Sequence, residues 1–162
     1  MSAQGSIGRN MLFGFIAAVI AVVTFHQAIV FILANAGMLP ATSQAWSLRP
    51  YGPLGVPTIV NTMFWGGLWG ALFGAIWHKL PGGAMWLRGL IFGLIITVVS
   101  NWTLLPLIRA KIFGVTNAAQ TALFSGGDPM RMLAVVLIVG GFGLGTGLIF
   151  QAMAKPRTAE LA

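Results

Sequence analysis

The stretch MLFGFIAAVIAVVTFHQAIVFILANAGML, residues 11–39, decides the fold class of this chain. It contains no Lys, Arg, Asp or Glu, and the charge-free region extends from Arg9 to Arg49. About 20 consecutive apolar residues are enough for a helix to cross the hydrocarbon core of a bilayer. We therefore predict that residues 11–39 form a membrane-spanning helix.

Three more apolar runs follow, at residues 57–78, 87–107 and 132–153. Each run is continuous, whereas the strands of a membrane barrel would alternate apolar and polar residues. A helix also satisfies its own backbone hydrogen bonds inside hydrocarbon, where no water is present to do so. The sequence therefore predicts an all-α fold: an integral membrane four-helix bundle that forms a single transmembrane domain over residues 1–162.

The composition agrees with this interpretation. Hydrophobic residues make up 57% of the chain and charged residues 7%, against about 25% charged residues in a soluble domain. So few charges cannot cover a water-exposed surface, and the lipid bilayer is the predicted partner of that surface. The chain has no cysteine, which excludes disulfides, thiolate metal sites and cysteine nucleophiles.

The net charge of +7 comes from nine Lys and Arg residues that stand singly or in pairs at the ends of the apolar runs. They form no stripe that could follow a phosphate backbone, which argues against nucleic-acid binding. Residues in these positions are typical topology signals. If the four runs cross the membrane in turn, one side carries five of these residues: Arg9, Lys79, Arg88, Lys155 and Arg157. The other side carries four: Arg49, Arg109, Lys111 and Arg131.

This count, together with the short turn between Lys79 and Arg88, favours a cytoplasmic location for both termini in a bacterial inner membrane. The connections at residues 40–56 and 108–131 would then lie on the opposite side. Trp46, in the first of these connections, is expected at the membrane interface, where tryptophan is enriched.

The two halves of the sequence resemble each other at an offset of 79 residues. The matching residues are Arg9, Phe13, Gly14, Ile16, Val19 and Thr24 in the first half and Arg88, Phe92, Gly93, Ile95, Val98 and Thr103 in the second. Such a match indicates two parallel-repeat helical hairpins, an arrangement found in some transporters. Chance is the alternative explanation, because apolar helices use few residue types.

Glycines recur at a spacing of four in the predicted helices, the GxxxG pattern. They are Gly66, Gly70 and Gly74 in the second run, Gly89 and Gly93 in the third, and Gly141 and Gly145 in the fourth. Small residues at this spacing let helices approach closely in lipid. The pattern predicts packing within the bundle, and a spare glycine face would in addition dock a second copy or a larger membrane complex.

A small set of polar residues interrupts the apolar runs. His26 and Gln27 lie near the middle of the first run, Asn61 lies in the second and Asn101 in the third. An ionisable residue at such a depth is a candidate functional residue by default. The alternative is a structural hydrogen bond between helices, worth about 0.6–2 kcal/mol.

The sequence contains no recognisable constellation for catalysis. Its only acidic residues are Asp128 and Glu160, which lie in a connection and in the C-terminal tail. Neither a carboxylate pair nor a Ser-His-Asp arrangement is therefore available. The glycine run at residues 140–147 lacks the G-x-G-x-x-G spacing of a phosphate loop. We expect no enzyme activity, no cofactor and no metal site.

Three segments resemble a group of small proteobacterial inner-membrane proteins: Phe25-His26-Gln27, Leu54-Gly55-Val56-Pro57 and FWGGLWG at residues 64–70. The resemblance covers mainly the first half of the chain, to about Pro81. It implies a four-helix inner-membrane protein, and it brings with it no functional residue.

Two functions follow from these patterns. The first is a structural or accessory subunit that packs through its glycine-rich helix faces against itself or a larger membrane complex. The second is a small transporter or channel subunit that uses the polar cluster around His26.

Overall fold

The computed structural model describes residues 6–51 and 54–154 of the chain. It is 77% helical, which confirms the predicted all-α fold. Four helices are long and apolar enough to cross a membrane: Ile7–Asn35, Thr58–Lys79, Met85–Lys111 and Pro129–Ala154. The predicted topology signals Lys155 and Arg157, and the acidic residue Glu160, lie outside the described residues.

Two of the four long helices are interrupted by π-helical turns. The first consists of α1 (Ile7–Ala21), the π-turn η1 (Val22–His26) and α2 (Gln27–Asn35). The third consists of α4 (Met85–Ile96), the π-segment η3 (Thr97–Leu104) and α5 (Leu105–Lys111). The second is α3 (Thr58–Ile76), followed by the 3-10 turn η2 (Trp77–Lys79), and the fourth is α7 (Pro129–Ala154).

Short elements lie in the two long connections. The strands β1 (Pro50–Tyr51) and β2 (Val56–Pro57) pair antiparallel between α2 and α3. The helix α6 (Ala118–Thr121) and the 3-10 turn η4 (Leu123–Gly127) precede α7.

Local sequence explains where the first long helix begins and ends. Ser6 caps its start, because the Ser6 hydroxyl accepts the Arg9 N–H at 3.3 Å. Its end is a Schellman motif around Gly37, which adopts φ +71°. The Met38 N–H donates to the Leu33 carbonyl, and the Gly37 N–H donates to the Ala34 carbonyl. The helix therefore stops at Asn35, four residues before the end of the predicted span.

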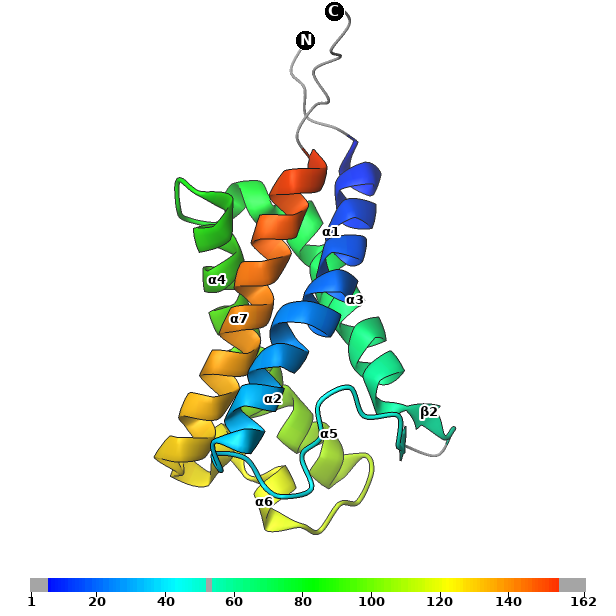
Figure 1. Cartoon of the computed structure of the whole chain (residues 1–162), viewed down its shortest axis with the longest axis vertical. Coiled ribbons are helices and arrows are strands. Elements are labelled where there is room, and N and C mark those ends of the chain that lie inside the picture. Colours follow the sequence, from blue (N-terminus) through cyan, green and yellow to red (C-terminus); the bar gives the residue numbers. More distant parts are fainter. Residues whose placement is uncertain (1–5, 52–53, 155–162) are drawn as a thin grey trace, which may run out of the picture.

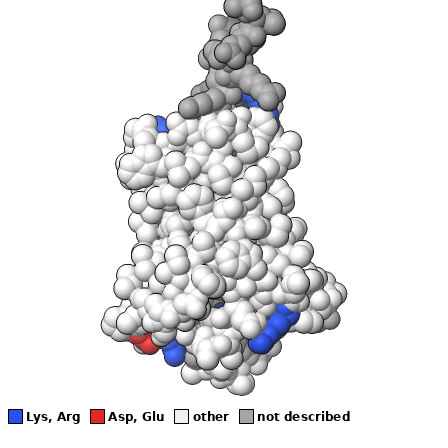
Figure 2. Space-filling view, in the orientation of Figure 1, with Lys and Arg blue, Asp and Glu red and all other residues white. Residues whose placement is uncertain are grey.

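The long helices alternate in direction, so both termini of the helical body lie at one end of the molecule (Figure 1). We call this the termini end; the connections α2–α3 and α5–α7 form the opposite, loop end. On the face seen in Figure 2, Lys, Arg and Asp side chains gather toward the two ends, and the belt between them is uncharged. Helix α1 packs against α3 and α7, and α4 packs against α7.

The core is aromatic where α3, α4 and α7 meet. The Phe73 ring centroid lies 5.3 Å from that of Phe92 and 5.5 Å from that of Phe150. Phe73 and Phe150 are fully buried. Tilted and edge-on ring contacts of this kind are the favoured arrangements for aromatic pairs.

The glycines with regular spacing lie where helix backbones come closest. A Cβ atom at Gly70 would overlap Ala18 and the backbone of Gly14, so α1 and α3 pack there without intervening side chains. Between α4 and α7, a Cβ atom at Gly89 would overlap the backbone of Gly143. The other five predicted packing glycines also face atoms of this chain: Gly66, Gly74, Gly93, Gly141 and Gly145.

Candidate functional site

The π-turn η1 changes the backbone hydrogen bonds in the middle of the first long helix. The Gln27 N–H donates to the carbonyls of Val22 and Thr24, five and three residues earlier. In an α-helix it would instead donate to the carbonyl of Val23. The turn thus releases the Val23 carbonyl from its regular helix partner, and a released backbone group in an apolar environment needs another partner.

Trp46, from the α2–α3 connection, supplies that partner. Its indole Nε1–H donates to the Val23 carbonyl at 2.9 Å. Its backbone N–H donates to the side-chain Oε1 of Gln27 at 2.8 Å, and Gln27 is buried. The Trp46 ring also packs against Phe31, with 6.1 Å between centroids. One loop residue therefore completes the hydrogen bonding of the interrupted helix.

Because Trp46 bonds to Val23, the α2–α3 connection returns a long way along the first long helix. Val23 precedes Asn35, the last residue of α2, by twelve positions. At 1.5 Å per residue, this corresponds to roughly 18 Å of helix. Figure 1 shows the connection in cyan, rising from the end of α2 back alongside that helix. The connection is therefore re-entrant, since it returns toward the middle of the bundle.

The backbone of Trp46 is strained. It adopts φ +50°, in the left-handed region that residues with a side chain rarely occupy. Such a conformation costs about 1–3 kcal/mol and persists only where the surroundings impose it. The two hydrogen bonds to Val23 and Gln27 provide that constraint.

His26 closes the π-turn and is half-buried. The Gln27 side-chain amide Nε2 donates to His26 Nδ1 at 3.3 Å. With Nδ1 as the acceptor, the neutral ring carries its proton on Nε2. The ring also packs edge-on against Phe142 of α7, with 6.5 Å between centroids. The Gln27 amide thus links the imidazole to the re-entrant connection, because its Nε2 donates to His26 and its Oε1 accepts the N–H of Trp46.

The other two residues of the predicted polar cluster lie apart from this network. Asn61 is half-buried near the start of α3, and Asn101 is half-buried within η3. Neither side chain forms a hydrogen bond with any residue in the described part of the chain. The structure therefore joins His26 to Gln27 and leaves Asn61 and Asn101 outside their hydrogen-bonded chain.

Sequence reasoning missed the role of Trp46. It placed Trp46 among the aromatic residues at the membrane interface, whereas the structure bonds it to the middle of a helix. One feature of the sequence indicated a contact of this kind: a glutamine within an apolar run needs hydrogen-bond partners when it is buried. Nothing in the local sequence says which distant residue provides them.

The second π-segment, η3, is completed differently. The Leu105 N–H donates to the Ser100 carbonyl, again five residues earlier. The Thr103 hydroxyl donates to the Val98 carbonyl at 2.9 Å, so a side chain of the same segment takes part in the irregular bonding. The Trp102 ring packs 5.7 Å from Phe124 of η4, and its buried Nε1 has no partner among the described residues.

The chemistry of the site is that of neutral hydrogen-bonding groups. Asp128, the only acidic residue in the described ranges, lies at the loop end and forms an ion pair with Arg131 at 3.2 Å. No group of three His, Asp or Glu side chains able to hold a metal ion occurs among residues 6–51 and 54–154. An imidazole and an amide can bind a polar solute or pass a proton along a hydrogen bond.

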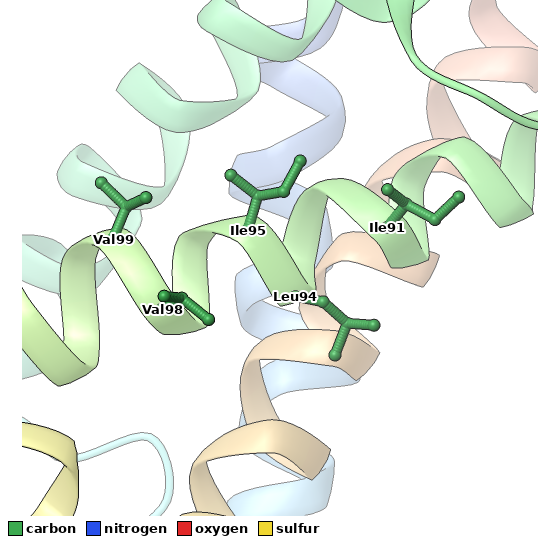
Figure 3. A pocket seen from close by; sticks show the side chains of 5 residues that line it. All are labelled: Ile91, Leu94, Ile95, Val98 and Val99. Atoms are coloured by element: carbon green, nitrogen blue, oxygen red, sulfur yellow. The ribbon is translucent and has the colours of Figure 1, made fainter.

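An apolar hollow of about 420 Å³ lies elsewhere, on the outer side of α4 and η3 (Figure 3). The side chains that line it all come from this one helix: Ile91, Leu94, Ile95, Val98 and Val99. It contains no polar side chain and no part of the His26 network. It is therefore a depression in the apolar surface rather than a polar binding site.

No family model, no curated protein and no solved structure matches this chain.

Proposed function

We propose that this protein is a small multi-pass membrane protein of the transporter or channel class, with its solute site at the helix interruption around His26. The observation that carries the proposal is the bond from Trp46 to the Val23 carbonyl in the middle of the first long helix. Non-helical backbone at such a depth is tolerated only where protein buries it or where it lines a water-filled cavity. Irregular backbone of this kind marks substrate sites in many transporters.

The interruption itself adds support. Single π-turns within α-helices occur frequently at functional sites. Here the π-turn ends in His26, whose ring bonds to Gln27 and packs on Phe142. A half-buried imidazole that packs on α7 and is linked through Gln27 to the α2–α3 connection is suited to binding a polar solute or relaying a proton.

The layout of the two halves supports a repeat. In each half, a long helix broken by a π-segment precedes a continuous helix that packs on it through glycines, α1 with α3 and α4 with α7. We propose that the halves are parallel-repeat hairpins related by an axis along the membrane normal, as in some transporters. The four apolar helices would cross a bacterial inner membrane, with the termini end in the cytoplasm.

The glycine faces favour transport over docking through those faces. All seven glycines predicted to mediate packing face atoms of their own chain. A partner that docked on these glycines would have to displace the first long helix from α3 or from α7, or α4 from α7. These seven glycines therefore support close packing of the bundle, and none of them is free to contact a second protein.

The test is a flux measurement on the purified protein in proteoliposomes. Proton flux is read with trapped pyranine, and solute flux by light scattering with potassium salts, glycerol and urea outside the vesicles. We expect at least one flux well above that of protein-free vesicles, and a loss of about tenfold or more in His26→Ala. His78→Ala is the matched control, because His78 is exposed at the termini end. If no tested gradient dissipates faster than in empty vesicles, the transport proposal fails.

A second candidate function, an accessory subunit of a larger membrane complex, has one observation in its favour. Phe64 and Trp65 are 53% and 56% exposed on the outer side of α3, with their ring centroids 5.5 Å apart. Exposed aromatic pairs are frequent anchors of protein interfaces. Isolation of the tagged protein in mild detergent would show a stoichiometric partner, lost in a Phe64→Ala, Trp65→Ala variant. Wild-type protein free of partners would exclude this function.

A further inference from the structure

The most exposed large apolar side chains of the described residues are concentrated at the loop end. Leu48 and Leu54, in the α2–α3 connection, are 74% and 87% exposed. Ile112 and Phe113, directly after α5, are 71% and 68% exposed. These side chains are more exposed than any large apolar side chain on the outer faces of the four long helices. In water, such exposure of apolar surface would be unfavourable.

An exposed basic residue adjoins each apolar site in the sequence. Arg49 follows Leu48, and Lys111 precedes Ile112. Neither forms an ion pair with any residue in the described ranges, because Asp128 is the single acid there and is paired with Arg131. We call Leu48, Arg49, Leu54, Lys111, Ile112 and Phe113 the basic rim.

The backbone holds both parts of the rim in place. The Arg49 carbonyl accepts both the N–H and the hydroxyl of Thr58, each at 2.9 Å. In the same connection β1 pairs with β2, and Leu54 lies between the two strands in the sequence. After α5, the Phe113 N–H donates to the Ile108 carbonyl at 3.2 Å. Backbone hydrogen bonds therefore hold Arg49 and Phe113, one residue from each part of the rim.

We infer that the basic rim binds the anionic phospholipid headgroups of the leaflet at the loop end. Its apolar side chains would enter the boundary between headgroups and acyl chains, as they do in interfacial helices. Arg49 and Lys111 would then lie at the level of the phosphates, which supply the counter-charges that the described residues do not provide. Among the described residues, the loop end carries four basic residues and one acidic residue, so the net charge also favours an anionic surface: Arg49, Arg109, Lys111, Arg131 and Asp128.

A soluble acidic protein would fit this surface less well. It would pair with the two cations but leave the neighbouring Leu54 and Phe113 in water. A bilayer interface satisfies both features at once, because its apolar and anionic layers lie within a few ångströms of each other.

The charge contribution is tested by titrating the full-length protein in detergent with dioleoyl phosphatidylglycerol or dioleoyl phosphatidylcholine and following thermal unfolding. The rim variant is Arg49→Gln with Lys111→Gln. The control is Arg9→Gln with Lys79→Gln, which removes two exposed basic residues at the termini end. We expect the phosphatidylglycerol affinity of the rim variant to fall about 30-fold, since each basic residue near an anionic surface contributes about 1 kcal/mol. The control should lose clearly less affinity than the rim variant.

Equal losses of affinity in the two double variants, or equal stabilisation by the two lipids, would overturn the inference. No hydrogen bond of the described residues uses the side chains of Arg49 or Lys111, so the rim variant should fold normally. Helix content by circular dichroism and unfolding without lipid verify this. The outcome is independent of any flux, so it can succeed or fail separately from the transport proposal.

The apolar contribution is tested with a fluorescent label, because the chain has no cysteine of its own. An NBD label at Ile112→Cys should be shielded from iodide and quenched by acyl-brominated lipid in phosphatidylglycerol vesicles. Thr116→Cys, an exposed polar position in the same connection, is the control and should remain accessible to iodide. Equal iodide accessibility at the two positions would contradict insertion of the rim.

Discussion

The indole N–H of Trp46 donates to the carbonyl oxygen of Val23 at 2.9 Å, which joins a connection to the middle of a long helix. The carbonyl is available because η1 shifts the Gln27 N–H to Val22. The π-turn and the re-entrant connection therefore depend on each other. Without the π-turn, the indole N–H of Trp46 would lose its acceptor. Without Trp46, the Val23 carbonyl would lose the donor that replaces its regular helix partner.

Replacing Trp46 with Phe tests this dependence, because Phe retains an aromatic ring and removes only the indole N–H donor. We expect a loss of about 0.5–1.5 kcal/mol of stability, seen as a fall in the unfolding temperature of about 2–4 °C per kcal/mol. Trp86→Phe is the matched control: both tryptophans are 44% exposed, and the indole N–H of Trp86 donates to no described residue. An equal effect of the two substitutions would show that the Trp46 bond contributes nothing.

Gln27→Leu removes the side chain that links His26 to Trp46. The Trp46 N–H loses its acceptor, so we expect the α2–α3 connection to open more often. Hydrogen–deuterium exchange measured by mass spectrometry should show faster exchange at residues 40–51, with little change in α7. Gln44→Leu, an exposed glutamine in the same connection, should leave that exchange unchanged. Unaltered protection of this segment in Gln27→Leu would mean that the bond from Trp46 to Val23 holds the connection without help from Gln27.

Gly70→Ala tests the closest approach of α1 and α3. The added methyl group would overlap Ala18 and the backbone of Gly14, so the helices must separate. Overpacking of this kind costs about 1–3 kcal/mol, and thermal unfolding in detergent should show it. At Gly8 the added methyl group meets no atom within 4 Å. Gly8→Ala should therefore be neutral or stabilising, because alanine is the better helix former. Equal stabilities of the two variants would contradict the close packing.

Asp128 begins the fourth long helix. Its Oδ1 accepts the N–H groups of Met130 at 2.9 Å and Arg131 at 3.2 Å, which makes it an N-cap. Asp128→Ala should lower the free energy of unfolding by about 1 kcal/mol. Asp128→Asn keeps an acceptor in place and should retain most of that stability, although it loses the ion pair with Arg131. If Asn destabilised the protein as much as Ala, the exposed ion pair would be the stabilising contact instead of the cap.

The polar cluster shows where sequence reasoning reached its limit. His26 and Gln27 attract attention because polar residues are rare in an apolar run. Asn61 and Asn101 stand out for the same reason, yet their side chains make no hydrogen bond with a described residue. Polarity within a run identifies candidates, but their contacts depend on how the helices rotate and pack. That information is spread over the whole bundle.

By itself, the sequence determined the number and type of the long elements. A run of apolar residues without charge is a local property, and a helix is the structure in which such a run satisfies its own backbone. Only the tertiary structure decided that Trp46 bonds to Val23 and Gln27 and that Gly70 faces Gly14. A π-turn has no sequence signature, and the donor that completes it lies 23 residues away. Glycines at the same spacing occur on several helices, so only the packing of the whole bundle selects which of them meet.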